Sequence, residues 1–141
     1  MAADFNNCTP DAPPATANIA VSGTVYDFQS LGSMDPVELI GATVTPFAVG
    51  DFTFSTPLVP QSALTNDVGV FTLTLSAGVE SRISWRTEHS SGLPTYALNE
   101  QLDVTQSMVT VNRAVVSTLT ANAIPQLIGT ERVSGAGVLA G

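Results

Sequence analysis

The stretch ALTNDVGVFTLTL, residues 63–75, decides the fold expected of this chain. Its second half alternates strictly, so Phe71, Leu73 and Leu75 lie on one side of an extended segment and two threonines lie on the other. Ahead of them, residues 66–69 read Asn-Asp-Val-Gly and include residue types that tolerate the positive φ angles of a tight connection. The stretch therefore predicts a turn that leads directly into a half-buried β-strand.

Four other segments show apolar alternation between turn-forming residues. Strands are expected from Ile19 in NIAVSGTVYDF, over residues 41–47 in GATVTPF, within residues 76–89 in SAGVESRISWRTEH, and around residues 95–104. In all, the chain has six or seven short candidate strands, with turn signals every 8 to 15 residues. This spacing is typical of an antiparallel β-sandwich, so an all-β fold is predicted.

Single positions in these strands carry further expectations. Gly23, in the middle of the first strand, indicates a bulge or a close approach of another backbone. Pro46 lacks an N–H group, so it marks the end of a strand or an edge position. Within residues 76–89 the alternation separates a core face from a solvent face. The expected core set is Val79, Ser81, Ile83, Trp85 and Thr87, and the expected solvent set is Arg82, Ser84 and Arg86.

The last third of the chain has a different pattern, which predicts a short helix over residues 113–123. Ser107 or Asn112 is the expected start cap, and Pro125 and Gly129 are expected to close the helix. The β-branched content of the segment opposes this helix. The apolar residues with helical spacing are Met108, Val111, Val115 and Leu119.

Three regions are expected along the chain. Residues 1–17 contain three prolines and no apolar period, which predicts an extended leader. Residues 18–125 form the β-sandwich domain with its C-terminal helical extension. Residues 126–141 are a Gly-rich tail or the start of a following module.

The composition limits the classes of partner. Of the 141 residues 44% are hydrophobic and only 11% are charged, which favours a folded chain over a disordered one. Lysine is absent, and the net charge of -8 repels phosphates, so nucleic acid is not an expected partner. The chain has no run of 18 apolar residues, so no membrane span is predicted. The first residues, MAADFNN, lack the features of a signal peptide. The chain has a single cysteine, Cys8, so the cysteine count does not distinguish an oxidising from a reducing compartment.

Three short motifs follow one another in the chain. They are Gly23, Val25 and Asp27 in VSGTVYD, then Gly41, Ala42 and Val44 in IGATVTPF, then Thr65, Gly69 and Phe71 in TNDVGVFTLTL. With SWRTEHSSGLPTY, residues 84–96, they resemble the pattern of a carboxypeptidase regulatory-like domain. The resemblance covers about residues 18–104 and implies a seven-strand, antiparallel, transthyretin-like sandwich of the broader Ig-like type.

The resemblance also implies that this chain is one module of a longer extracytoplasmic protein. The final GAGVLAG resembles the start of another such domain. One enzyme, the hydroxyisourate hydrolase, has the transthyretin-like fold, but it uses several His and Arg residues and ends in Tyr-Arg-Gly-Ser. This chain has one histidine and ends in GVLAG, so that activity is not expected. The Lys–Asn cross-links of related cell-surface domains are excluded because the chain has no lysine.

Side chains that carry chemistry are few. His89 is the only histidine, so it cannot form a two-histidine metal site, and no G-x-S-x-G motif supports a nucleophilic serine. No catalytic, metal or cofactor site is therefore predicted, and the protein is not expected to be an enzyme. A calcium site between neighbouring loops is an alternative, although no D-x-[DN]-x-[DN]-G loop is present. The carboxylates available to it are Asp27, Asp35, Glu38, Asp51 and Asp67.

Trp85, His89 and Tyr96 are the candidate contact residues. Trp85 and Tyr96 would stack against a sugar if both are exposed, whereas a tryptophan on the inner face of a sandwich strand belongs to the core. The function expected is that of a non-catalytic module, secreted or on the cell surface, with a structural or protein-interaction role. Its partner would be another protein or further copies of itself. The alternatives are a glycan-binding module and a subunit of a surface, fibre or virion assembly.

Overall fold

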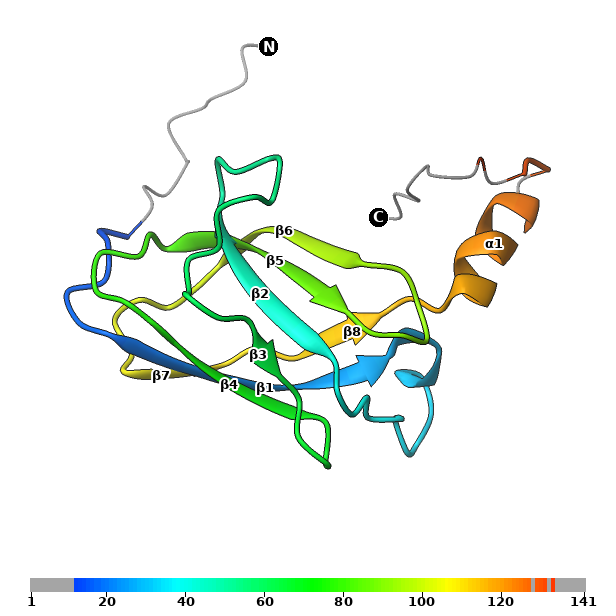
Figure 1. Ribbon diagram of the computed structural model, residues 1–141, viewed down its shortest axis with the longest axis horizontal. Helices are drawn as coiled ribbons and strands as arrows, with labels where there is room; N and C mark the ends of the chain where they lie inside the picture. Colours follow the sequence, from blue (N-terminus) through cyan, green and yellow to red (C-terminus); the bar gives the residue numbers. More distant parts are fainter. Residues whose placement is uncertain (1–11, 128, 132, 134–141) are drawn as a thin grey trace, which may run out of the picture.

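The computed structural model describes residues 12–127, 129–131 and 133, and it shows two four-stranded sheets stacked as a β-sandwich (Figure 1). The first sheet contains β4 (Val70–Leu75), β1 (Ile19–Asp27), β7 (Met108–Thr110) and β8 (Arg113–Val115). The second contains β3 (Ala63–Leu64), β2 (Thr43–Ala48), β5 (Arg82–Glu88) and β6 (Thr95–Gln101), in that order. A single 3-10 turn, η2 (Phe28–Ser30), follows β1, and helix α1 (Thr118–Leu127) extends from one end of the sandwich.

The turn and strand predicted from residues 63–75 are confirmed. The Asn66 side chain accepts hydrogen bonds from the backbone of Val68 and Val70, and Gly69 has a φ of 68°. In β4 Phe71 and Leu75 are buried, the leucine between them is half-buried, and both threonines are exposed. The strand pairs antiparallel with β1 along its whole length, so its apolar face lines the core.

The described residues form eight strands rather than seven, and the sandwich is not purely antiparallel. The short strands β7 and β8 both run parallel to β1, one beside its first half and the other beside its second half. Gly23 lies at the junction between them, where the Val111 N–H donates to the Ser22 carbonyl at 2.8 Å. A Cβ at Gly23 would lie 2.0 Å from the Val111 oxygen. The expectation of a close backbone approach at this glycine is therefore confirmed.

Pro46 lies inside β2 rather than at its end. β2 has neighbours on both sides, but β3 pairs only with Thr43 and Val44. Beyond that point the Pro46 carbonyl accepts a hydrogen bond from the Leu58 N–H at 2.9 Å. A proline is tolerated here because no ladder hydrogen bond from β3 requires its missing N–H.

The helix begins later than the sequence pattern predicted. Residues 113–115 form β8, and α1 covers Thr118–Leu127. Ser117, rather than Ser107 or Asn112, caps its start, since its hydroxyl accepts a hydrogen bond from the Thr120 N–H at 3.1 Å. Pro125 lies within the last turns, and Gly129 follows the helix with a φ of 76°. The β-branched residues ahead of the helix pair with β1, as their propensity favours.

The packed unit begins slightly before residue 18. Ala15 is buried, and its backbone exchanges hydrogen bonds with Gly78 and Val79. Residues 12–17 of the expected leader therefore include part of the core. Residues 1–11, most of the expected leader, and residues 134–141, which hold the Gly-rich end, lie outside the described residues.

Candidate functional site

The connection between β2 and β3, which rises above the sheets in Figure 1, packs on part of the outer face of the second sheet. Phe47 of β2 is fully buried although it points outward, because Phe54 of this connection packs edge-on against it with ring centroids 5.2 Å apart. The Phe54 ring also contacts Tyr96 of β6 at a centroid distance of 4.6 Å. Three rings from three segments thus form one contiguous aromatic cluster.

Asp51 holds this connection in place. Its carboxylate accepts hydrogen bonds from the backbone N–H groups of Thr53, Ser55 and Thr56 at 3.2, 3.0 and 2.8 Å, and from the Thr53 hydroxyl at 2.8 Å. These donors, the Thr56 N–H first among them, lower the pKa of Asp51 because they stabilise the charged form. The loop is therefore organised by its own residues.

The loop presents apolar side chains in a defined arrangement. Phe54 has a φ of 51°, a left-handed conformation that is uncommon for a bulky residue and is retained only when its surroundings enforce it. Phe52 is 87% exposed, and Tyr96 and Leu98 of β6 are about half exposed. We refer to Phe52 and Phe54 of the loop, together with Tyr96 and Leu98 of β6, as the aromatic platform, in which Phe54 and Tyr96 are the two residues in ring contact. Strained backbone and exposed aromatic residues occur together at binding sites, so the platform is the candidate functional site.

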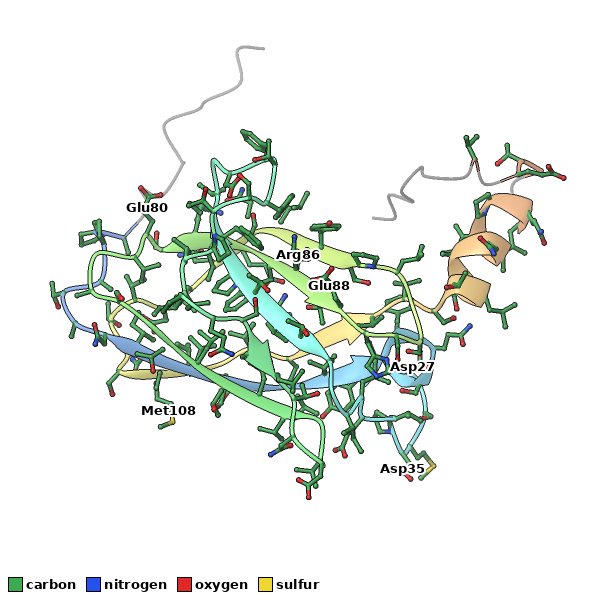
Figure 2. The ribbon with its side chains drawn as sticks, viewed as in Figure 1. Asp27, Asp35, Glu80, Arg86, Glu88 and Met108 are labelled. Carbon is green, nitrogen blue, oxygen red and sulfur yellow. The ribbon has the colours of Figure 1, made fainter. Side chains whose placement is uncertain are left out.

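A charged pair lies beside the platform on β5, where Figure 2 shows Arg86 and Glu88 close together. The Arg86 guanidinium lies 5.2 Å from the centre of the Phe47 ring and donates a long hydrogen bond of 3.4 Å to the Phe54 carbonyl. Its Nε is 3.1 Å from the Glu88 carboxylate but is not aligned for a hydrogen bond, and it has no other partner. Arg86 pairs in register with Tyr96 on the neighbouring strand. The Arg86 side chain thus borders the platform and is 28% exposed, but its Nε atom is buried and paired with Glu88.

The core face predicted for residues 76–89 is confirmed, because all five of its residues are buried: Val79, Ser81, Ile83, Trp85 and Thr87. The outer face of β5 is less exposed than expected. Ser84 is only 4% exposed, and its hydroxyl accepts a hydrogen bond from the Asn99 N–H of β6.

Trp85 lies inside the sandwich and not at the surface. Its side chain is 1% exposed, so it offers no face to a ligand. Of the two interpretations given for Trp85, the one that places it in the core is therefore confirmed. The Arg113 guanidinium lies 5.2 Å from the centre of the Trp85 rings and also pairs with Glu100. Arg113 is buried and its Nε has no hydrogen-bond partner. This cluster belongs to the core.

His89 and Tyr96 are not brought together in one site. The Nδ1 atom of His89 lies 2.7 Å from the Ser91 hydroxyl and accepts from the Ser91 N–H at 3.2 Å, and its Nε2 lies 3.0 Å from the Ile40 carbonyl. Both ring nitrogens are thus used to fasten the β5–β6 connection to the segment ahead of β2. Tyr96 is part of the platform.

The carboxylates proposed as calcium ligands do not converge. Among the described residues, no three or more His, Cys, Asp or Glu side chains are grouped so that they could hold a metal ion. Asp51 is engaged by its own loop, and Asp27 accepts from the Gln29 N–H after β1. Asp103 makes a similar local turn with Thr105, which lowers its pKa through the Thr105 hydroxyl.

Phe52 and Phe54 were not recognised from the sequence. They lie in GDFTFSTP, residues 50–57, where two apolar residues alternate with threonine and serine like a short strand. The signal that distinguishes them is Asp51 followed by Thr53, Ser55 and Thr56, a pattern that favours side-chain capping of a tight loop.

The fold and the platform define a β-sandwich module with an organised aromatic surface. No family model matches the chain, and no curated protein matches it. Among solved structures the chain is similar to the major plantain pollen allergen, with 16% identity and a TM-score of 0.47. That similarity covers 84% of this chain and 99% of the allergen chain. No helix in the described part of the chain is long and apolar enough to cross a membrane.

Proposed function

We propose that this protein is a non-catalytic β-sandwich module that works outside the cytoplasm by surface contact, in a structural or interaction role. The observation that carries the proposal is the aromatic platform. Phe52 is 87% exposed on a loop that Asp51 holds with four hydrogen bonds. A large apolar side chain exposed on a loop that is ordered by its own hydrogen bonds is available for contact with a partner, and this supports the proposal.

The motif residues support assignment to the carboxypeptidase regulatory-like class. Gly41 and Gly69 have φ values of 75° and 68°, as turn glycines of that pattern require. Ala42 is fully buried where the two sheets approach each other, and Phe71 is 1% exposed in the core. An extracytoplasmic location follows from the resemblance to this class, whose members are modules of exported proteins.

A role without catalysis fits the way in which the polar side chains are used. His89 has both nitrogens committed to a loop, Asp51 serves its own turn, and Arg113 is enclosed beside Trp85. General acid–base or nucleophilic catalysis needs such groups to face a common space. The partner classes compatible with the platform are another protein, a further copy of the chain, and a glycan.

The proposal is tested by retention on envelope material from the source cells. Wild-type protein is expected to be retained, and Phe52→Ala is expected to be retained at least several-fold less, because the substitution removes the most exposed ring of the platform. Met34→Ala is the matched control, since Met34 is fully exposed on a different loop. Equal retention of the three proteins, or none at all, would overturn the proposed function. Protease treatment of the envelope then shows whether the partner is a protein.

A further inference from the structure

The first sheet of the sandwich has a free edge along β4. Successive residues of a strand in an antiparallel pair direct their N–H and C=O groups to opposite sides. The Val25 N–H of β1 donates to the Gly69 carbonyl at 3.0 Å, and from Gly69 onward every second residue of this segment bonds to β1. Thr72 and Thr74 lie between these residues, so their backbone N–H and C=O groups point away from β1. No other described strand pairs with β4.

The backbone groups of Thr72 and Thr74 are available at this edge. Val70, at the start of β4, also points away from β1, but its N–H donates to the Asn66 side chain and its carbonyl accepts from the Asn66 N–H, both at 2.9 Å. Neither threonine has a backbone partner on this side among the described residues, and both threonines are exposed. Two N–H and two C=O groups therefore face water, in a row of the kind that a further strand can bind.

β4 lacks the usual protection of a sheet edge against pairing. Natural proteins protect their edges with short strands, charges, prolines or bulges. In the described part of this sandwich β3 has two residues, β7 and β8 have three each, and β6 pairs irregularly with β5 and contains Asn99 with a φ of 53°. The six residues of β4, VFTLTL, include no charge, proline or glycine, and they pair with β1 without a register shift. β4 thus keeps the regular backbone that strand addition requires.

The free groups of β4 match those of a second β4. When two copies pair antiparallel with Leu73 opposite Leu73, Thr72 of each copy lies opposite Thr74 of the other. Opposite residues whose backbone groups face one another exchange two hydrogen bonds. All the free N–H and C=O groups of both edges are then used, and the opposed threonines form a favourable cross-strand pair.

The side chains at this edge also suit a second copy. Leu73 is half-buried, whereas Phe71 and Leu75 on either side are 1% and 0% exposed, so the core is incompletely covered at the centre of the edge. Leu73 of the second copy would lie next to it on the same face. The strand carries no charge, so the net charge of -8 does not place like charges opposite one another along the paired residues. We propose that β4 pairs with β4 of a second copy and joins the two first sheets into one continuous sheet.

The size of this contact sets its strength. β4 offers six residues, whereas a standard interface has about 20–30 residues on each side. The dimer is therefore weak and reversible, with a Kd on the order of 100 µM. It involves the first sheet, whereas the aromatic platform lies on the second, so this inference goes beyond the proposed function and does not depend on it.

Sedimentation velocity of the full chain, from about 10 µM to about 1 mM, measures the association. Wild type is expected to change from monomer to dimer over this range. Thr74→Pro is expected to weaken association about tenfold or more, because proline removes an outward N–H and leaves the bonds to β1 in place. Thr110→Pro is the matched control. Thr110 is an exposed threonine at the opposite edge of the sheet, and the neighbouring Val111, rather than Thr110, donates to β1.

Cysteine cross-linking tests the register and does not rely on the folding of the proline variant. In a Cys8→Ser background, Leu73→Cys is expected to form a disulfide-linked dimer about tenfold faster than Thr110→Cys, or faster still. The reason is that the two residues at position 73 face each other within the Cα distance of a disulfide.

The outcomes separate this dimer from the proposed function. A wild type that is monomeric at about 1 mM, equal dimerisation of Thr74→Pro and Thr110→Pro, or equal cross-linking of the two cysteine variants overturns the pairing through β4. Phe52→Ala is expected to dimerise like wild type and yet to lose envelope retention, so either proposal can fail without the other.

Discussion

Replacing Gly23 with alanine tests how the first sheet is held together. The added Cβ would lie 2.0 Å from the Val111 oxygen and 3.0 Å from the Phe71 ring, and contacts of a Cβ under 3.0 Å are essentially never observed. The Val111 backbone must therefore move by about 1 Å, which takes its 2.8 Å hydrogen bond to Ser22 out of range. Overpacking costs about 1–3 kcal/mol and a lost backbone hydrogen bond about 1 kcal/mol, so Gly23→Ala is expected to lose about 2–4 kcal/mol.

Urea unfolding followed by Trp85 fluorescence measures this loss, since Trp85 is the only tryptophan and lies in the core. Gly32→Ala is the matched control, because a Cβ there meets nothing within 4 Å. The control is expected to stay within about 1 kcal/mol of wild type. If Gly23→Ala unfolds at the same urea concentration as Gly32→Ala, β7 and β8 do not approach β1 as described, and the reasoning is wrong.

Leu75→Ala is expected to cost about 2–5 kcal/mol, and Leu73→Ala less, because Leu75 is fully buried and Leu73 only partly; equal urea midpoints would contradict this order. The pKa of Asp51 is lowered in the folded loop. The stability that its hydrogen bonds give the loop is therefore fully present above about pH 4 and is lost as the pH falls below 4 through the folded pKa. Amide NMR shifts of the loop should therefore change in that acidic range, and in Asp51→Asn this change should be absent. Arg113→Met is expected to be neutral or stabilising in urea, because the buried guanidinium leaves its Nε without a partner. A loss above about 2 kcal/mol would show instead that its pair with Glu100 holds the sheets together.

The aromatic platform could be anticipated only in part. Tyr96 was expected to stack against a sugar together with Trp85, and it does lie on the surface. Trp85, the other candidate for stacking, is 1% exposed because the strand alternation directs it inward. Phe54 contacts Tyr96 through a loop that precedes it by more than forty residues in the chain. No local pattern specifies that approach.

The sequence by itself determined the features that depend on neighbouring residues. The alternation of β4 and β5 assigned the inner faces correctly, since a period of two places successive side chains on opposite sides of any strand. The close approach at Gly23 and the turn at Gly69 could be predicted because glycine alone fits such positions without strain.

The tertiary structure alone decided the features that depend on distant segments. β7 and β8 run parallel to β1, and this pairing converts residues 113–115 from an expected helix into a strand. The loop held by Asp51 buries Phe47 on a face that alternation alone would leave open to solvent. Both outcomes are set by contacts between segments far apart in the chain. Backbone hydrogen bonds and apolar burial across such distances outweigh local propensity, which differs by less than about 1 kcal/mol per residue.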